Sequence, residues 1–214
     1  KIKKREKTIR FIFIPETIGS IAYLSKNLKK LKDHVIGGYN LTCIGDERNH
    51  SCIFSKYENS PSDVALKESY KKLKIRYKKY PFLKRGSDER QFNSPGVDLG
   101  ITSISRSIYS QFPEYHTSLD DFNLVTVKGL SGGFKVALEC IKNLQKRIIP
   151  RNLIVCEPQM GKRNLYYDYR AKKKGFPRDY MNFLQYADGK NDLFEISKKI
   201  KTQIQYTRKI YIIL

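Results

Sequence analysis

The sequence contains no apolar run that approaches the roughly 20 residues needed to cross a membrane. Its basic start is not followed by the apolar stretch and small-residue cleavage site of a signal peptide. None of the four cysteines forms a CxxC pair, which argues against a cysteine zinc site. A nucleophile elbow, a P-loop and a dinucleotide fingerprint are also missing. We therefore expect a cytoplasmic protein without membrane contacts, whose thiols are reduced.

Acidic residues are scarce, since 42 Lys and Arg residues face 21 Asp and Glu residues, a formal net charge of +21. Such a surplus is compatible with a phosphate-binding surface. The basic residues are nevertheless spread over several segments, among them Lys26–Lys32, Lys67–Arg85 and Arg170–Lys174. No nucleic-acid-binding motif accompanies the main body of the chain. We therefore expect solvated helix surfaces with weak polyanion binding, and no specific nucleic-acid partner.

The spacing of apolar residues predicts an α/β domain. Ile9–Ile14 and Tyr39–Ile44 are short apolar runs typical of strands, and Ile18–Leu31 between them has helical spacing. A strand, a helix and a strand in this order predict a βαβ unit with a parallel strand pair. The remaining predicted elements are a helix over Pro61–Tyr80, a strand over Val97–Ile104, a helix following Gly132-Gly133, a strand over Leu153–Cys156, and two short helices over Met181–Ala187 and Leu193–Ser197.

Acidic residues stand at the ends of the first two predicted strands. Glu16 and Asp46 each follow an apolar run, and ligands of open α/β sheets bind at the carboxyl ends of strands. His116 lies four residues before Asp120, and a carboxylate can set the tautomer of a metal-binding histidine. Such donors suit zinc, beside which a free glutamate serves as general base. Plainer roles stay open, because Glu16 can favour a helix dipole, Asp46 can be a turn residue and His116 a loop residue. The other two histidines, His34 and His50, are predicted to be solvated surface groups.

Several motifs resemble those of the zinc-dependent aminopeptidase superfamily. Tyr115–Asp120 (YHTSLD) resembles its metal-histidine motif YHTxxD, and Ser87–Phe92 (SDERQF) resembles its SDHxxF loop. Up to about Ile200, the chain is similar to an aminopeptidase-like family associated with polysaccharide biosynthesis, which also carries a C-terminal winged helix. This closer resemblance depends on the strings Phe13–Ser20, Asp88–Gly96 and Glu157–Arg163.

The resemblance implies an α/β fold with a mixed, largely parallel sheet and helices on both faces. It implies zinc-dependent hydrolysis of a peptide or related amide, with one or two zinc ions in the full-length protein. By resemblance, Glu16 is the general base and Asp88 supports the catalytic loop. Asp46 and His116 are metal ligands, and Asp120 orients His116.

The resemblance also implies three parts: an aminopeptidase-like domain over 1–157, a linker over 158–177 and a partial winged helix over 178–214. A protein partner is expected at the winged helix. Thr17 replaces a metal-binding glutamate of the superfamily, and the segment with its first histidine ligand is not in the sequence. We therefore expect an N-terminally truncated fragment with weak zinc binding and little turnover, whose tail after Ile200 departs from the family.

Two alternatives to a hydrolase remain. The first is a non-catalytic aminopeptidase-like scaffold in surface-polysaccharide synthesis, which the exchange at Thr17 favours. The second is a winged-helix binding protein, with Leu193–Ile200 as its recognition helix. The presence of Glu195 in that helix weakens the case for contact with DNA.

Overall fold

The computed structural model of the protein describes residues 6–163, 165 and 177–214. The chain divides into two compact units, Lys1–Lys146 and Arg147–Leu214. The second unit thus begins at Arg147, inside the range 1–157 that was expected for the aminopeptidase-like domain. The predicted linker over 158–177 lies largely outside the described residues. Within the described residues, each helix is too short or too polar to cross a membrane.

The first unit contains a mixed four-stranded sheet in the order β1-β4-β2-β3. Its strands are β1 (Gly38–Leu41), β2 (Ser51–Ile53), β3 (Lys78–Tyr80) and β4 (Ile101–Ser105). β1 runs parallel to β4 and β2 parallel to β3, whereas β2 and β4 are antiparallel. The predicted mixed, largely parallel sheet is therefore confirmed.

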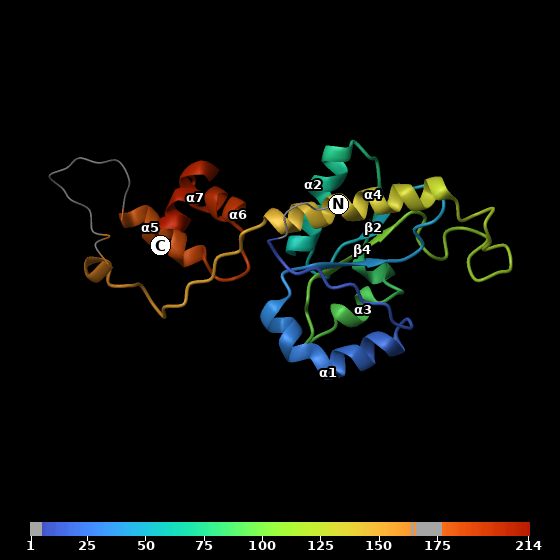
Figure 1. The fold of residues 1–214 in the computed structure, drawn as a ribbon, viewed down its shortest axis with the longest axis horizontal. Helices are drawn as coiled ribbons and strands as arrows, with labels where there is room; N and C mark the ends of the chain where they lie inside the picture. Colours follow the sequence, from blue (N-terminus) through green and yellow to red (C-terminus); the bar gives the residue numbers. More distant parts are fainter. Residues whose placement is uncertain (1–5, 164, 166–176) are drawn as a thin grey trace. The chain divides into compact units, whose positions relative to one another are not determined.

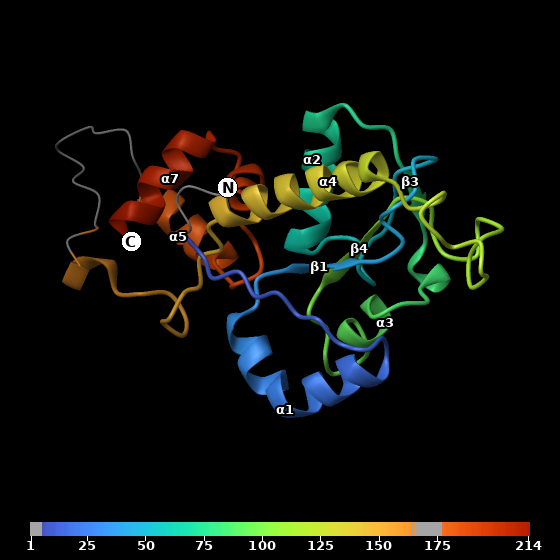
Figure 2. The ribbon, with the colours of Figure 1, turned by 45° about the vertical axis from the view of Figure 1, so that its right-hand side comes forward.

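Helices cover both faces of this sheet, as predicted (Figures 1 and 2). Helices α2 (Pro61–Leu73) and α4 (Val127–Lys146) pack together on one face, and α1 (Ile18–His34) and α3 (Glu89–Phe92) lie on the other. A short 3-10 helix, η1 (Phe82–Lys84), follows β3. The core between the sheet, α2 and α4 consists of Cys52, Phe54, Leu66, Tyr70, Ile104, Val136, Ala137 and Cys140. Cys52 and Cys140 are buried free thiols, which agrees with the expected reduced state.

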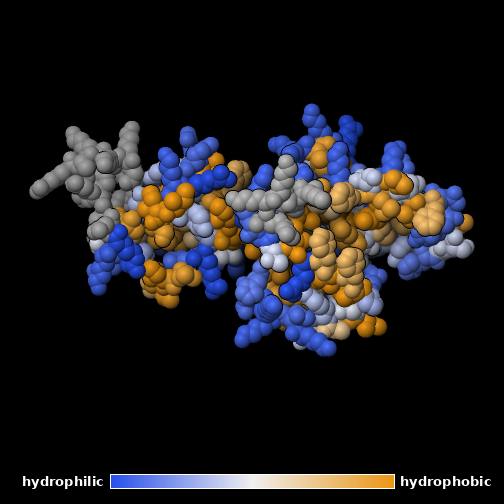
Figure 3. Space-filling model, viewed as in Figure 1, coloured by the Kyte–Doolittle hydropathy of each residue, from blue (hydrophilic) through white to orange (hydrophobic). Residues whose placement is uncertain are grey.

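The predicted strand over Ile9–Ile14 is wrong. The segment has no strand structure, and Phe11 and Phe13 are 72% and 92% exposed. Figure 3 shows apolar surface in the region that the dark-blue start of the chain crosses in Figure 1. The expected βαβ unit is therefore absent, because β1 pairs with β4, which comes much later in the chain. An apolar run favours burial, but a strand also requires a neighbouring strand with free hydrogen-bonding groups.

The helix predicted over Pro61–Tyr80 ends early, at Leu73. Lys74 adopts a left-handed conformation with φ 54°, which closes the helix, and the chain then enters β3. The aromatic stripe that suggested a longer helix still packs together. The rings of Tyr70 and Tyr77 stack with their centroids 4.1 Å apart, although only Tyr70 is helical. The spacing of the aromatic residues therefore arises because they pack in the same core, and not because they lie on one continuous helix.

Helix α4 begins at Val127, before the glycines that were predicted to precede it. Three glycines lie inside its first half because the helix approaches other parts of the chain closely. A Cβ atom at Gly129 would lie 1.8 Å from the carbonyl oxygen of Gly45, and one at Gly133 would lie 3.1 Å from Ile44. Glycine thus lets α4 pack directly on the loop that follows β1.

The second unit is helical. Its elements are η2 (Met160–Arg163), α5 (Pro177–Tyr186), α6 (Leu193–Lys199) and α7 (Ile204–Ile213). The two predicted short helices match α5 and α6. Asp192 and Glu195 form a capping box at the start of α6, and Asp192 also pairs with the buried Arg147.

The strand predicted in the second unit is wrong. Leu153–Cys156 is not a strand, and Leu153 and Val155 are almost fully exposed. After Ile200 the chain forms α7, which buries Ile210 completely against a core that includes Phe183 and Ile196. Since α7 follows α6 after a short turn, α7 and not α6 is the second helix of a helix-turn-helix arrangement.

Candidate functional site

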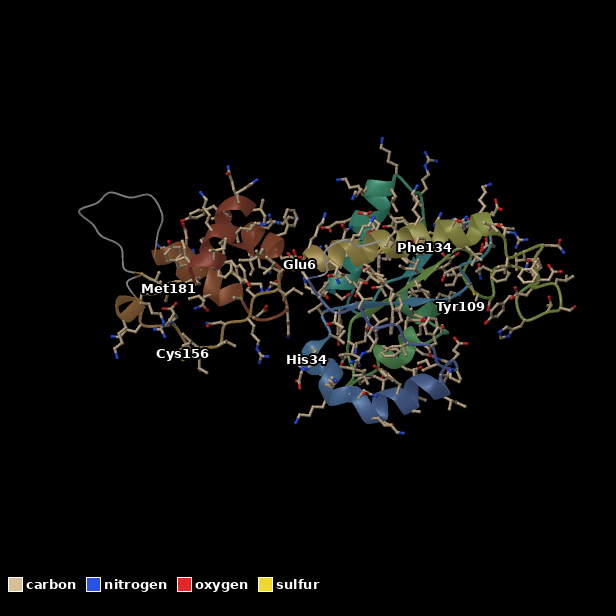
Figure 4. The ribbon with its side chains drawn as sticks, in the orientation of Figure 1. Glu6, His34, Tyr109, Phe134, Cys156 and Met181 are labelled. Atoms are coloured by element: carbon tan, nitrogen blue, oxygen red, sulfur yellow. The ribbon has the colours of Figure 1, made fainter. Side chains whose placement is uncertain are left out.

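A cavity of about 390 Å³ lies in the first unit, where the segment after β1 meets the long loop between β4 and α4. Glu16, just before α1, contributes from a third segment. The chemically active residues of the lining are Glu16, Cys43, Tyr109, Tyr115, His116 and Asp120. In Figure 4 the labelled Tyr109 lies near the end of the sheet from which the yellow-green loop extends. The fold therefore brings together residues that are about 100 positions apart.

Three of the predicted site residues, Glu16, His116 and Asp120, line this cavity. The side chains of Glu16 and Asp120 accept no hydrogen bond from any described residue, and no hydrogen bond joins Asp120 to His116 within the described part of the chain. The imidazole of His116 instead stacks on Tyr115, with ring centroids 3.9 Å apart. The cavity thus presents two uncommitted carboxylates beside an aromatic surface.

Asp46 does not line the cavity, and its carboxylate is committed to internal contacts. The residue is only 4% exposed. Its Oδ1 accepts hydrogen bonds from the backbone N–H of Arg48 and the hydroxyl of Ser107, both at 2.8 Å. Its Oδ2 accepts one from the backbone N–H of Ser107 at 2.7 Å. Asp46 therefore fastens the segment after β1 to the end of β4.

Asp88 also lies outside the cavity lining, but it holds the residues next to Glu16. Its carboxylate accepts hydrogen bonds from the backbone N–H of Thr17, at 2.8 Å, and from the hydroxyl of Ser20. Arg90 donates to the hydroxyl of Thr17. Helix α1 has no side-chain cap, and Asp88 instead fixes its N-cap residue Thr17 and the hydroxyl of Ser20 in its first turn. It thereby positions the backbone that carries Glu16.

Three residues with a left-handed backbone conformation lie at or beside the cavity. Thr17, Cys43 and His116 have φ angles of 62°, 48° and 58°, in the left-handed region that side chains other than glycine rarely adopt. Thr17 is adjacent to Glu16, and the other two line the cavity. Such strained positions persist only when the surrounding structure holds them, and they are frequent at binding sites.

An ion pair restrains the loop that carries His116. The guanidinium of Arg48 donates two hydrogen bonds to the carboxylate of Glu114, at 2.8 and 2.6 Å. This contact lowers the pKa of Glu114 to about 2. Phe112 packs edge-on against Tyr115, with ring centroids 5.6 Å apart. These contacts stabilise the aromatic wall of the cavity.

Cys43 supplies a thiol to the cavity but not a ready nucleophile. Burial is the main cause that raises the pKa of Cys43. The hydroxyl of Thr42 lowers this pKa in part, and the negative charges of Asp120, Asp46 and Glu16 raise it further. The thiolate is the reactive form of cysteine, so a raised pKa keeps this group neutral near pH 7. Cys43 therefore contributes a small, weakly polar surface.

Sequence reasoning missed Glu89, which is completely buried behind the cavity. Its carboxylate accepts hydrogen bonds from the side chains of Asn40 and Ser103, at 2.9 and 2.8 Å. The backbone N–H groups of Gly86 and Ser87 also donate to it. The available signal was the presence of Asn40 and Ser103 inside apolar strands, because buried polar side chains require partners.

Glu89 fixes the position of Tyr109 in the cavity wall. The phenolic oxygen of Tyr109 lies 3.1 Å from Oε1 of Glu89 and 2.9 Å from the carbonyl oxygen of Lys84. Burial raises the pKa of Tyr109, and the charge of Glu89 raises it further. Tyr109 therefore remains a neutral hydrogen-bond donor.

His50 is not the solvated surface group that the sequence suggested. It is half-buried and packs edge-on against Tyr70, with ring centroids 6.3 Å apart. Arg106 has only donor groups, so its contact with Nε2 makes that nitrogen the acceptor and places the ring hydrogen on Nδ1. Burial, followed by the charge of Arg106, lowers the pKa of His50 to about 4. His50 therefore takes part in the charged cluster around Asp46.

The residues present do not fit a metal centre on their own. Within the described residues, no group of three or more His, Cys, Asp or Glu side chains is arranged to hold a metal ion. The expected convergence of Glu16, Asp46 and His116 on one cation is not formed, since Asp46 turns into the protein.

Comparison with known proteins gives consistent matches for both units. A family model described as "Domain of unknown function (DUF4910)" matches residues 1–147, and one described as "winged helix-turn-helix" matches residues 148–214. The second match includes the tail after Ile200, which was expected to depart from the family.

One match among curated proteins and one among solved structures both come from Clostridium acetobutylicum. One, described as a "Putative polysaccharide biosynthesis protein with aminopeptidase-like domain", is 37% identical over 202 residues, which is 92% of this chain and 45% of that protein. The other is the crystal structure of a "putative peptidase", with a TM-score of 0.61 and 33% identity, covering 93% of this chain and 45% of that one. The chain thus spans less than half the length of these relatives.

Proposed function

Because the chain belongs to the DUF4910 domain family and joins that domain to a winged helix-turn-helix, we propose that its first unit is the substrate-binding part of an aminopeptidase-like hydrolase. The ligand is a peptide or related amide with a free amino group. The family relationship supports the class of ligand. The cavity with Glu16, His116 and Asp120 supports the position of the site.

The single observation that carries this proposal is the pair of uncommitted carboxylates in one cavity. Glu16 and Asp120 line it, and no described residue supplies a cation or hydrogen-bond donor that would neutralise them. A protonated amino group offers three donors and a positive charge, which matches two carboxylates in a partly enclosed space. Glu16 is the residue proposed to accept a proton from the ligand or from water, and His116 packs beside the bound group.

Ligand binding tests this proposal directly. Calorimetric titration with alanylalaninamide, at moderate ionic strength, should detect binding, and N-acetylation of the ligand should weaken it about tenfold. Glu16→Gln and Asp120→Asn should each reduce the preference for the free amine. Asp33→Asn, on the exposed end of α1, is the matched control and should leave it unchanged. Equal affinity for the free and acetylated ligands contradicts the proposal.

Hydrolysis, with zinc as the implied metal, is proposed for the longer architecture of the relatives. The described donors of this chain make no cluster of three, and catalytic zinc normally has three protein ligands. We expect this chain to take up zinc substoichiometrically, as measured by mass spectrometry of the dialysed protein. A full-length relative should release nitroaniline from aminoacyl-nitroanilides. Turnover that is unchanged by the exchange equivalent to Glu16→Gln would remove Glu16 from its proposed role.

A second candidate is a non-catalytic aminopeptidase-like scaffold. Thr17 favours this reading because, by resemblance, it stands at a metal-binding glutamate position. Asp88 binds its N–H group and Arg90 its hydroxyl group, so Thr17 serves the structure. In this case, the cavity binds the amine without cleavage. Amine-selective binding combined with absent turnover in the full-length protein favours the scaffold, and robust turnover rejects it.

The second unit is proposed to bind a protein partner. Its exposed apolar residues include Phe194 on α6 and Ile212 on α7, and the former lies under the ammonium group of Lys198. This mixed apolar and basic surface is compatible with a protein contact. Salt-sensitive, sequence-selective DNA binding that requires Arg208 on α7 would instead assign this unit to nucleic acid.

A further inference from the structure

A second cavity, of about 230 Å³, shares the side chain of Tyr109 with the first. Its lining comes from Tyr80 of β3, Lys84 of η1 and the stretch Ile108–Gln111 that follows β4. All of these residues belong to the first unit. One aromatic side chain therefore borders both cavities.

Tyr109 is held firmly in this position. Its phenolic oxygen contacts the carbonyl oxygen of Lys84 and the buried carboxylate of Glu89. Its ring also lies against Gly86, where a Cβ atom would come within 2.6 Å of a ring carbon. The contact with the Lys84 backbone ties the second cavity to the wall of the first. A ligand that extends from one cavity to the other therefore passes a side chain whose position is fixed.

The two cavities have opposite chemistry. The first contains the carboxylates of Glu16 and Asp120, whereas no carboxylate lines the second. Lys84 is exposed, and within the described residues its ammonium group forms no ion pair. Tyr80 and Ser110, which also line this cavity, carry hydroxyl groups that can donate hydrogen bonds. A cation thus matches the first cavity, and an anion such as a carboxylate matches the second.

We propose that the second cavity is an anion subsite, in which Lys84 takes the terminal carboxylate of a short peptide whose amino group occupies the first cavity. This inference rests on the proposed function of the first cavity and narrows its ligand to short peptides with both ends free. Tyr109 sets the separation between the two charged ends. An extended peptide advances at most about 3.3–3.6 Å per residue, so a dipeptide and a tripeptide test two different reaches.

The test compares peptides that end in a carboxylate with their C-terminal amides. Calorimetric titration of the whole chain uses alanylalanine, trialanine and the amide of each. At one length or both, the carboxylate form should bind about fivefold more tightly than the amide, in line with a partly exposed ion pair. Raising the salt concentration should reduce this preference. Lys84→Met should abolish it and Lys84→Arg should retain it, whereas Lys26→Met, on the exposed surface of α1, should leave it unchanged.

The outcomes separate this inference from the proposed function. If the amides bind and depend on a free amino group, but the carboxylates bind no better at either length, the anion subsite is overturned and the first cavity keeps its function. If the carboxylate preference depends on Lys84 while N-acetylation has no effect, the anion subsite stands and the amine site falls. A preference that survives Lys84→Met overturns the assignment of Lys84, and absence of binding by all four peptides overturns both proposals.

Discussion

Buried and cavity-lining carboxylates of the first unit differ in how they are satisfied. Asp63 and Glu89 are completely buried, and each accepts hydrogen bonds from several serine, threonine, asparagine or backbone donors. Glu16 and Asp120 lie at the cavity and accept none from the described residues. The first pair joins strands and loops into one framework, while the second pair remains available to a ligand. Acidic residues of the same type thus divide between stability and binding according to the donors around them.

The largest expected effect is that of removing the Glu89 carboxylate. Glu89→Ala removes the carboxylate that accepts from Asn40, Ser103 and two backbone N–H groups, of which those of Ser103 and Ser87 are buried. We expect the free energy of unfolding to fall by about 3 kcal/mol or more, measured by urea denaturation. Glu89→Gln, which keeps one acceptor oxygen, should cost less. If Glu89→Ala lowers the free energy of unfolding no more than an ordinary surface substitution does, the buried and the cavity-lining carboxylates do not differ in their contribution to stability.

The second largest loss of stability is expected when the close contact between α4 and the segment after β1 is disturbed. Gly129→Ala places a methyl group 1.8 Å from the position of the Gly45 carbonyl oxygen, so the helix must move away. We expect a loss of about 2 kcal/mol in the free energy of unfolding, measured by thermal or urea denaturation. Ser131→Ala, on the exposed side of α4, is the control and should be neutral or slightly stabilising. If both variants have the same free energy of unfolding, the start of α4 can move away from Gly45 without loss of stability.

The charged cluster behind the cavity should give stability a pH dependence. The pKa of His50 is about 4 in the folded protein, below the ordinary value near 6.5, because of burial and the charge of Arg106, which the charge of Asp46 opposes only in part. Between these values the unfolded chain binds more protons, so stability falls as the pH is lowered from 6.5 towards 4. The difference in unfolding free energy between the wild type and His50→Gln should therefore change between pH 7 and pH 5. A constant difference would mean that His50 is solvated, as the sequence suggested.

The smallest effect on stability is expected at the cavity itself. Glu16→Gln and Asp120→Asn each remove a charge that no described residue neutralises. The free energy of unfolding should change by no more than about 0.5 kcal/mol, as for ordinary surface substitutions. The same variants should weaken amine binding, as described above. A large loss of stability in either variant would instead place that carboxylate in the framework.

Local patterns in the sequence identified most of the helices. Helix α1 matches its apolar spacing, and α6 begins at a capping box formed by Asp192 and Glu195. The mixed sheet with helices on both faces was also predicted, through the family resemblance. These features depend on residues close in the chain or on long matching motifs, which a single sequence contains.

The incorrect predictions share a physical cause. Ile9–Ile14 is as apolar as a buried strand, but whether a strand forms depends on a partner elsewhere in the chain. The glycines in α4 resembled a helix boundary, yet Gly129 is required because the backbone of Gly45 comes close to it. Asp46 resembled a ligand at a strand end, but Ser107 and Arg48 donate to its carboxylate.

The sequence by itself determined the fold class, the two short helices α5 and α6 of the second unit, and the candidate residues Glu16, His116 and Asp120. Only the tertiary structure decided which of the candidate acids face the cavity, because that depends on hydrogen-bond donors contributed by distant strands and loops. It also decided that Tyr109 and Lys84 lie beside the site. The position of Tyr109 follows from contacts with Glu89, the Lys84 backbone and Gly86 that local spacing does not encode.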